Sequence, residues 1–489
     1  MPAKNGKQFL DRINHAKPSV WFRGEQIDGR ISDHPAFCGL MAAQAELYDM
    51  QHDSGLKERM TYASPATGDP VGMSFLQPRT KEDLEKRRRM SMLWGEKHHG
   101  LLGRSPDYMN TGLMAFYAAA ELLEESDPRF AENLRKYYEY CRDNDITLSH
   151  AFVQPHASRF DELLEDGSIE SCAARIVEEN ADGIVVEGAF LLATQGITTD
   201  EILVYPPASS YMPEEDNPRT FAFAVPNNLP GIRWICRESL AGGSSSYDYP
   251  LSSRFDEMDT LVLFDHVLVP WDRVFIRGND HLSMRLFSES GYHVHSAHQV
   301  LCRYVAKLEF TLGVILYMAE TLDRSTYPAT IEKVAEVMVQ LETLKSLLIA
   351  SEAGAGPDRF GSMLPDRKPL WTANVLFPKI YPRMMEIIQL VGGSSIIMIP
   401  SELDFASESK PYLDKYLRGN TVNASSKTAL FRLAWDLSSS GFGGRQTLYE
   451  RFFFGDTSVV VNRLYQSYTE TDKKAYVNKI KAFLGQKDE

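Results

Sequence analysis

Three polar side chains with complementary acid–base properties occur in two short stretches of the sequence. Arg104 and Tyr108 belong to HGLLGRSPDYMN (99–110), and His150 belongs to TLSHAFVQPHASR (147–159). Arginine keeps its charge at ordinary pH, a phenol hydroxyl can donate or accept, and an imidazole titrates near neutrality. Together such groups could stabilise an oxyanion and accept its proton. Locally, a capped surface turn and a structural histidine explain the same residues.

A second group of candidate residues has a spacing that metal ligands sometimes have. His293, His295, His298 and Cys302 follow the pattern H-x-H-x-x-H-x-x-x-C. Metal sites of this kind usually complete their coordination with a nearby carboxylate or a further thiolate. No such partner stands close by in the sequence, so we predict that the chain holds no metal.

The segment GFGGRQ (441–446) is rich in glycine but does not match a dinucleotide-binding fingerprint. It follows the helical stretch FRLAWDL, whereas the G-x-G-x-x-G motif opens a helix after a strand. The local pattern therefore favours a helix C-cap followed by a turn. Gly443 and Gly444, beside Arg445, could still let the backbone approach an anion closely. P-loops, G-x-S-x-G elbows and H-E-x-x-H zinc motifs are also absent from the sequence.

The composition is that of an acidic globular protein. The 489 residues include 52 Lys and Arg against 66 Asp and Glu, which gives a formal net charge of −14. Without a Lys/Arg-rich run, such a chain is a poor binder of nucleic acid or of anionic membranes, and we expect neither partner. No apolar stretch is long enough to span a membrane, and no secretory signal is evident. Five widely spaced cysteines favour free thiols and a cytoplasmic location. They are Cys38, Cys141, Cys172, Cys236 and Cys302.

The elements that must position these residues fall into three regions. Residues from about 36 to 145 have a helical pattern, and a helical pattern returns after Trp271. Between them, 147–275 consist of short β-branched and aromatic runs separated by Gly, Pro, Asn and Asp. We therefore predict an α+β fold with a helical domain, a middle antiparallel sandwich or barrel, and a helical bundle. The helices predicted in the last region are 296–324, 328–355, 372–392 and 421–438.

The helix that begins near Arg104 carries clear start signals. Ser105 is a good N-cap, Pro106 is favoured at the first helical position, and Asp107 suits the positive end of a helix. The helix start therefore places Tyr108 in the first turn. Apolar residues then recur every three or four positions, as on one face of an amphipathic helix. They are Met109, Leu113, Phe116, Tyr117, Ala120 and Leu123.

Several long segments have a recognisable combined pattern. The most specific is YDYPLSSRFDEMD (247–259), which continues to LVLFDHVLVPWDRVF (261–275). The others are GRSPDYMN (103–110), LSHAFVQPHASR (148–159), LLATQG (191–196) and GFGGRQTLYERFFFGD (441–456). In this order, and over nearly the whole chain, they resemble the 4-hydroxyphenylacetate 3-hydroxylase family. Its members are the oxygenase components of two-component, FADH2-dependent phenol monooxygenases.

The resemblance implies a fold, a cofactor and partners. The fold is similar to that of acyl-CoA dehydrogenases, with an N-terminal helical domain (1–146), a middle β-barrel (147–275) and a C-terminal four-helix bundle (276–489). The bundle would form a homotetramer, or dimer of dimers. FAD would lie extended between the domains and be used as FADH2 from a separate NAD(P)H:flavin reductase. With O2 as co-substrate, a flavin C4a-hydroperoxide would hydroxylate a phenol ortho to its hydroxyl, giving a catechol.

The resemblance also assigns residues. Position by position, the family's residues around the phenol hydroxyl match Arg104, Tyr108 and His150. Arg104 would stabilise the phenolate charge, Tyr108 would donate or accept, and His150 would act as the base. The flavin-binding positions match His156, Ala157, Ser158, Arg159 and Thr194, and also Gly443, Gly444, Arg445 and Gln446.

One departure from the family concerns the para substituent of the substrate. Where some members have Ser-Thr after a strand, this chain has Pro207-Ala208, and Ser209 and Ser210 follow. We expect Pro207, Ala208 and Ser209 to contact the substrate, and the serines could replace the missing hydroxyls. The substrate is then 4-hydroxyphenylacetate or, alternatively, phenol, a nitrophenol or a chlorophenol. The loop 205–215 is the segment that we expect to close the site.

Three other functions fit parts of the sequence. An acyl-CoA dehydrogenase would share the fold but needs a carboxylate base against the flavin, for which no clear candidate stands out. A lyase similar to 4-hydroxybutyryl-CoA dehydratase needs iron–sulfur ligands, but Arg104 and Tyr108 stand where its paired cysteines fall. Only His295 and Cys302 would remain as ligands. A non-catalytic helical tetramer would not require Arg104, Tyr108 and His150 together, so the hydroxylase is the favoured function.

Overall fold

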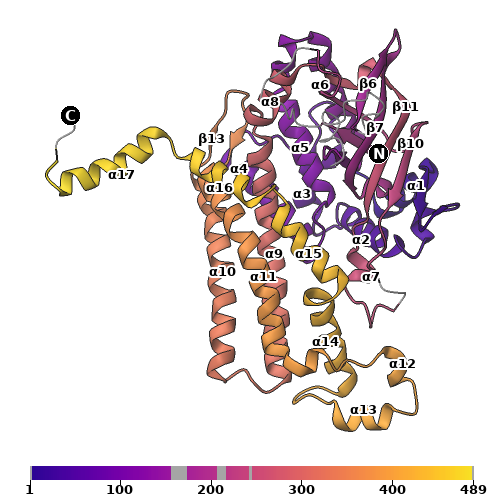
Figure 1. Cartoon of the computed structure of the whole chain (residues 1–489), viewed down its shortest axis with the longest axis vertical. Coiled ribbons are helices and arrows are strands. Elements are labelled where there is room, and N and C mark those ends of the chain that lie inside the picture. Colours follow the sequence, from indigo (N-terminus) through magenta and orange to yellow (C-terminus); the bar gives the residue numbers. More distant parts are fainter. Residues whose placement is uncertain (1–2, 156–172, 206–215, 242–244, 487–489) are drawn as a thin grey trace, which may run out of the picture.

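The computed structural model describes residues 3–155, 173–205, 216–241 and 245–486. These residues form the predicted α+β fold, in which a helical region, two sheets and a long helical bundle follow one another along the chain (Figure 1). The helices of the first region are α1 (Gly6–Ala16), α2 (Cys38–Asp49), α3 (Lys57–Met60), α4 (Lys81–Lys97), α5 (Pro106–Ala118) and α6 (Pro128–Asn144).

Two sheets form the middle of the molecule. One has six strands in the order β2-β1-β10-β11-β7-β6, and the other has four in the order β12-β9-β8-β5. Neighbouring strands are antiparallel except for the pairs β1/β10 and β5/β8, which are parallel. The strands are β1 (Val20–Phe22), β2 (Glu25–Gln26), β5 (Leu148–Ala151), β6 (Arg175–Glu179), β7 (Gly183–Thr194), β8 (Glu201–Val204), β9 (Phe221–Pro226), β10 (Ile232–Cys236), β11 (Asp259–Pro270) and β12 (Val274–Arg277). Two small hairpins are formed by β3 (Thr61–Ala63) with β4 (Pro70–Gly72) and by β13 (Gly356–Pro357) with β14 (Met363–Leu364).

The N-terminal region contributes two strands to the larger sheet, which the expectation of a helical domain over 1–146 did not include. Strands β1 and β2 extend the sheet beyond β10, with Val20 paired to Trp234 and Trp21 paired to Gln26. Strands of two or three residues are too short to show a periodicity in the sequence. The start of the chain is therefore joined directly to the strands of the middle region.

The last region is a bundle in which the long helices α9, α10 and α11 lie side by side (Figure 1). The four helices predicted here are confirmed as α9, α10, α11 and α14, with ends that differ by a few residues. The C-terminal helix α17 leads away from the body of the molecule (Figure 1). The helices are α7 (Ser252–Phe255), α8 (Asp280–Glu289), α9 (Tyr292–Thr321), α10 (Pro328–Ala353), α11 (Arg367–Gly392), α12 (Glu402–Phe405), α13 (Lys410–Tyr416), α14 (Ala424–Ser438), α15 (Gly441–Phe452), α16 (Thr457–Ser467) and α17 (Glu470–Phe483).

The glycine-rich segment 441–446 forms the first turns of helix α15. The sequence predicts a turn after the end of the preceding helix. Ser440 is the N-cap, and its Oγ accepts the backbone N–H of Gly443 at 3.1 Å. A Cβ at Gly443 would lie 2.5 Å from the backbone oxygen of Leu437, so only glycine lets α15 begin this close to α14. The predicted C-cap and turn is therefore wrong, because α14 ends at Ser438 and α15 begins at Gly441.

Helix α5 is buried on nearly every side, although its pattern predicted an amphipathic helix. All residues from Pro106 to Phe116 are buried, because the helix packs against α6, α9 and β5. Ser105 stands at the predicted N-cap position, but its Oγ donates to the carboxylate of Asp107 at 2.5 Å and caps no backbone N–H. The same carboxylate accepts hydrogen bonds from Ser91 and Gln299. The start of α5 is thus part of the core.

A buried lysine connects the start of the chain to the strand that carries His150. Lys4 is only 1% exposed, and its ammonium donates to the backbone oxygen of Asp145 and to Oγ1 of Thr147, both at 2.5 Å. It also forms an ion pair with Asp200 at 3.2 Å. Because Asp145 and Thr147 precede β5 directly, the N-terminus helps to fix the position of this strand.

The sequence predicts no membrane-spanning segment and free cysteines, and the described residues bear on both expectations. Within them, none of the helices combines the length and the apolar character needed to cross a membrane. Their cysteines, Cys38, Cys141, Cys236 and Cys302, are free thiols. Cys172 lies outside the described residues.

Candidate active site

One cavity contains several of the predicted site residues. Its volume of about 630 Å³ lies within the range of roughly 300–1,000 Å³ that is typical of small-molecule sites. It lies where the start of α5 meets the ends of β5, β7 and β8 and the helices α15 and α16. The described residues that line it are Arg104, Tyr108, Phe152, Val153, Leu192, Thr194, Tyr205, Asp259, Phe287, Tyr292, His293, Arg445, Leu448, Tyr449, Phe452, Phe453, Phe454, Gly455 and Arg463.

Arg104 lies in the wall of this cavity among aromatic rings. Its guanidinium carbon is 4.3 Å from the ring centre of Tyr108, 4.4 Å from that of Phe453 and 5.5 Å from that of Tyr449. Its Nε and Nη1 are buried and donate to no group among the described residues. The backbone N–H of Arg104 donates to Glu257 at 2.7 Å. Cation–π contacts therefore hold the cation in place, while two of its donors stay available for an anion.

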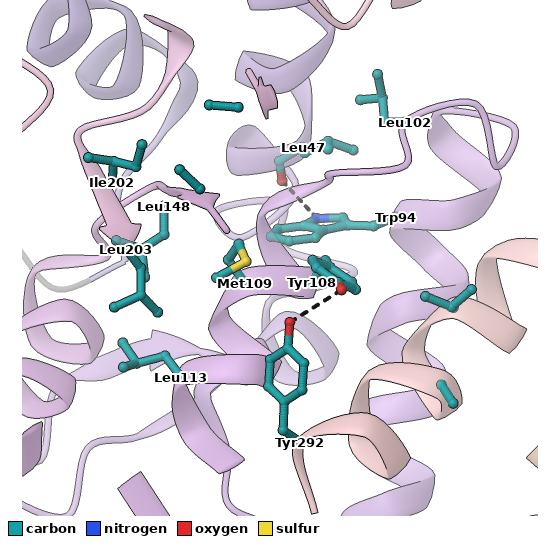
Figure 2. Close-up of a cluster of buried hydrophobic side chains, with 14 of the residues drawn as sticks. Leu47, Trp94, Leu102, Tyr108, Met109, Leu113, Leu148, Ile202, Leu203 and Tyr292 are labelled. Carbon is teal, nitrogen blue, oxygen red and sulfur yellow. Dashed lines mark hydrogen bonds between the residues drawn. The ribbon is translucent and has the colours of Figure 1, made fainter. Parts of the chain in front are cut away.

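Tyr108 belongs to a buried row of three phenol hydroxyls. The Tyr108 hydroxyl lies 3.4 Å from that of Tyr292, which lies 2.9 Å from that of Tyr205. Figure 2 shows the hydroxyls of Tyr108 and Tyr292 pointing toward each other from α5 and α9. Burial raises the pKa of Tyr292 well above its usual value of 10, so its phenol stays neutral. The hydroxyl of Tyr108 thus has a neutral hydrogen-bond partner, the hydroxyl of Tyr292.

His150, on β5, is buried beside the same rings. Its imidazole stacks on Phe152 with ring centres 5.0 Å apart, and it lies 5.9 Å from the rings of Tyr108 and Tyr205. Burial and, second, the charge of Arg104 hold the pKa of His150 well below its ordinary value of 6.5. The expectation that this imidazole titrates near neutral pH is therefore wrong. It is neutral there, and its Nδ1 has no hydrogen-bond partner among the described residues.

A second polar group lines another part of the cavity. Arg445 donates from Nε and Nη2 to the two oxygens of Asp259, at 2.6 and 2.7 Å. Thr194 and Arg237 donate to the same carboxylate at 2.8 and 2.9 Å. Although burial favours the protonated acid, the charges of Arg445 and Arg237 hold the pKa of Asp259 well below its usual range. Nη1 of Arg445 makes no hydrogen bond and lies 3.5 Å from Glu257.

The other predicted flavin positions on α15 do not line the cavity. Gly443 packs against the end of α14, and a Cβ at Gly444 would meet no atom within 4 Å. Gln446 points into the core, where its side chain accepts a hydrogen bond from Lys307 at 2.6 Å. It also donates to the backbone oxygen of Leu101 at 3.0 Å. Of the positions 443–446, only Arg445 lines the cavity.

A fully buried ionic cluster lies next to the rings that surround Arg104. The carboxylate of Glu450 accepts hydrogen bonds from Arg303 and from Lys307, and all three side chains are at most 1% exposed. Although burial favours the neutral acid, these two cations lower the pKa of Glu450 to about 2. Burial lowers the pKa of Lys307 to about 8. The cluster joins α15 to α9 and so fixes Tyr449, the neighbour of Glu450.

Seven of the predicted contacts cannot be compared with this cavity, because they lie outside the described residues. The flavin contacts among them are His156, Ala157, Ser158 and Arg159, and the substrate contacts are Pro207, Ala208 and Ser209. Of the loop 205–215, only Tyr205 is described, and its ring lines the cavity.

Sequence reasoning missed most of the aromatic wall and one cation. Phe453 stands in the run Phe452–Phe454, and three consecutive phenylalanines near a helix end are a signal that could have been used. Asp259 closes the most specific motif of the family resemblance, which was also a usable signal. Tyr292 and Arg463 stand in ordinary helical sequence, which does not separate them from core or surface residues.

The histidine-rich stretch of α9 serves several structural contacts. Nε2 of His298 lies 2.9 Å from Glu352, His293 lines the cavity, and His295 is buried together with Cys302. Across the described ranges of the chain, no three His, Cys, Asp or Glu side chains lie close enough together to hold a metal ion.

Buried histidines should make the protein sensitive to acid. Burial lowers the pKa of His98, His293 and His295 from 6.5 to about 3. Between pH 6.5 and about 3 the unfolded chain binds protons that the folded chain does not, so the free energy of unfolding falls as the pH falls. At pH 5 the loss is roughly 2 kcal/mol for each histidine. Urea unfolding at pH 7.5 and pH 5.0 measures it.

The matched variant for this prediction is His295→Gln, which removes one of the three titrating groups. Its unfolding midpoint should shift less between the two pH values than that of the unsubstituted chain. Equal midpoints at pH 7.5 and pH 5.0 for the unsubstituted chain would contradict the buried, neutral state of these imidazoles.

Comparisons with known proteins agree over the whole chain. Residues 5–276 match the family described as 4-hydroxyphenylacetate 3-hydroxylase N terminal, and residues 283–482 match the corresponding C-terminal family. A probable 4-hydroxyphenylacetate 3-monooxygenase of Bacillus subtilis is 43% identical over 480 residues, which cover 98% of each chain. The 4-hydroxyphenylacetate 3-monooxygenase oxygenase component of Thermus thermophilus is 41% identical over 489 residues, covering 99% of this chain and 97% of that protein.

A solved structure gives the same result for the fold. The crystal structure of a 4-hydroxyphenylacetate 3-monooxygenase oxygenase component, complexed with FAD and 4-hydroxyphenylacetate, has a TM-score of 0.91 to this chain. The two sequences are 41% identical, and the match covers 99% of this chain and 98% of the other.

Proposed function

Because the chain belongs to the 4-hydroxyphenylacetate 3-hydroxylase family, we propose that it hydroxylates a para-substituted phenol ortho to its hydroxyl, giving a catechol. It does so as the FADH2-dependent oxygenase component of a two-component monooxygenase, with 4-hydroxyphenylacetate as the type substrate. One observation carries the proposal. The unpaired guanidinium donors of Arg104 lie beside Tyr108 in the wall of one cavity, and the imidazole of His150 lies behind, 5.9 Å from the ring of Tyr108.

The residues of the cavity fit a flavin. Apolar side chains line it and are partly uncovered, with exposed fractions of 43% for Leu192, 57% for Leu448 and 52% for Phe452. A flat ring system would cover such surfaces, while Nη1 of Arg445 offers an unused donor to its polar edge. Thr194 and Arg445 are therefore the described residues that would hold FAD. When bound in reduced form, FAD supplies the electrons that activate O2.

Three residues act on the phenol in this proposal. Arg104 binds the phenol oxygen and stabilises its negative charge as the proton leaves, which makes the ortho carbon electron-rich. Tyr108 donates a hydrogen bond to the same oxygen and is itself supported by Tyr292. His150 is neutral and so can accept the phenol proton at a ring nitrogen, and it passes the proton on readily because burial and the charge of Arg104 disfavour its cation. Their burial keeps water away from the reacting groups.

A phenol panel tests the proposed function. The purified chain is supplied with FAD, NADH and a flavin reductase, and each reaction contains 4-hydroxyphenylacetate, 4-nitrophenol, 4-chlorophenol or phenol. We expect catechol formation, with more catechol per NADH for one para-substituted phenol than for phenol itself. The catechol is quantified by chromatography and the NADH by absorbance. If none of the phenols gives a catechol while NADH is consumed, the proposed function is wrong.

We also propose that the chain acts as a cytoplasmic homotetramer with a separate NAD(P)H:flavin reductase. Helix α10 supports the oligomer, because its apolar side chains are uncovered, and helix α17 has a similar apolar surface. The exposed residues of α10 are Ile331, Met338, Val339 and Ile349, and those of α17 are Tyr476, Val477, Ile480 and Phe483. Five cysteines without a paired spacing support the cytoplasmic location.

A further inference from the structure

Besides Arg104 and Arg445, the cavity contains a third arginine, which has no part in the proposed reaction. Arg463, on α16, lines the cavity together with His293, Phe454 and Gly455. Its Nη1 is buried and makes no hydrogen bond. No ion pair of the described residues includes Arg463, and its guanidinium carbon lies 5.3 Å from the ring centre of Trp371 on α11. The aromatic contact holds the cation in place without neutralising it.

The charges that line the cavity are not balanced. Asp259 is the only acidic residue among the described lining residues, and Arg445 and Arg237 already bind both of its oxygens. His293, the neighbour of Arg463, is neutral at working pH, because burial and the charge of Arg463 lower its pKa to about 3. Arg104 and Arg463 are thus two cations without an acidic partner in the described part of the cavity.

A ligand with two electronegative ends would suit this arrangement. A buried cation without a partner is unfavourable, and a bound anion relieves that cost. A guanidinium offers parallel N–H groups that match a carboxylate particularly well. A phenol with a carboxylate on a short para side chain has a phenol oxygen at one end and an anion at the other. Its aromatic ring would lie between them, among the aromatic side chains of the cavity.

We propose that Arg463 binds the carboxylate of a phenolic substrate whose hydroxyl is bound by Arg104. This inference rests on the proposed function and deepens it, because it assigns a residue of α16 to the carboxylate end of a substrate such as 4-hydroxyphenylacetate. It also supplies a carboxylate-binding group in a chain that has Pro207-Ala208 where some relatives have Ser-Thr. Arg463 is then a specificity-determining residue, because it acts on the part of the substrate that does not react.

The test compares one substrate that has the carboxylate with one that lacks it. For Arg463→Met, the ratio of kcat/KM for 4-hydroxyphenylacetate to kcat/KM for 4-methylphenol should fall about 30-fold, as expected for the loss of a charged hydrogen bond. Arg463→Lys keeps the charge but not the planar fork. Its ratio of kcat/KM values should therefore lie between that of the unsubstituted chain and that of Arg463→Met. Arg451→Met is the matched control, because Arg451 lines a different groove and is exposed. Its ratio should not change.

An equilibrium measurement separates this inference from the proposed function. Phenylacetate has the carboxylate but no phenol hydroxyl, so its binding in the presence of FAD, measured by calorimetry, does not depend on turnover. Arg463→Met should weaken this binding about 30-fold. An equal loss of kcat/KM for both phenols, or unchanged binding of phenylacetate, overturns the inference. Absence of catechol formation by the unsubstituted chain overturns the proposed function but leaves the binding result to decide the role of Arg463.

Discussion

Arg104→Met should lower the rate of catechol formation by about 10³-fold while NADH is still consumed, so that the activated oxygen is released as hydrogen peroxide. The physical reason is the loss of a guanidinium that lies over the ring of Tyr108 and has two unpaired donors among the described residues. Without it, the negative charge on the phenol oxygen has no counter-charge, and the ring stays a poor nucleophile. Catechol and hydrogen peroxide formed per NADH, measured together, show the effect directly.

Two further variants make the result for Arg104 specific. Methionine keeps the apolar contact with Tyr108 and Phe453, so the thermal unfolding temperature should change little. Arg104→Lys restores a charge without the planar fork. It should therefore recover part of the catechol formed per NADH. Arg451→Met changes an exposed arginine outside the cavity and should leave the catechol formed per NADH unchanged. A normal ratio of catechol to NADH in Arg104→Met would refute the role of Arg104.

Glu450→Ala should cost about 3–5 kcal/mol of the free energy of unfolding, because it leaves Arg303 and Lys307 buried without an acidic partner. With a pKa of about 2 in the folded chain against an ordinary 4.5, Glu450 stabilises the fold at pH values above 4.5. This contribution disappears only as the pH falls through about 2. Urea unfolding at pH 7 therefore measures the full effect.

Controls distinguish the buried charges from the loss of volume. Glu332→Ala removes an exposed glutamate of α10 and should change the free energy of unfolding by no more than about 0.5 kcal/mol. Replacing all three charged side chains together, as Arg303→Met, Lys307→Met and Glu450→Leu, should recover most of the lost stability, since no unpaired charge remains. A Glu450→Ala chain as stable as the unsubstituted chain would show that the cluster does not hold α15 against α9.

The parts of the site that could be predicted from the sequence are those carried by continuous motifs. Arg104 and Tyr108 share one motif and His150 lies in another, and the structure places both the Arg104 guanidinium and the His150 imidazole beside the ring of Tyr108. The buried environment of His150 could not be predicted, because it depends on Phe152, on Tyr205 and on the charge of Arg104. Local sequence reports residue types, whereas a pKa depends on what the fold places around them.

For the fold as well, the elements with a strong local pattern could be predicted, whereas those that depend on contacts between distant residues could not. Long helices such as α9 and α10 have a strong period and were predicted to within a few residues of their ends. Helix α15 was missed because Gly441, Gly443 and Gly444 are weak helix formers, and the close contact with Leu437 that requires Gly443 is not visible in the sequence. Strand β1 was missed because its partner, β10, lies far along the chain, and β2, which pairs with β1, has only two residues.

Lys4 has a consequence for the order in which the site forms during synthesis. It is synthesised before its partners Asp145 and Thr147, which emerge only after the helices between them, and Asp200 emerges later still. Until then the lysine has no acceptor, and the residues before β5 lack one of the contacts that hold them. The strand that carries His150 is therefore held in part by contacts between a segment that is made early and segments that are made more than 140 residues later.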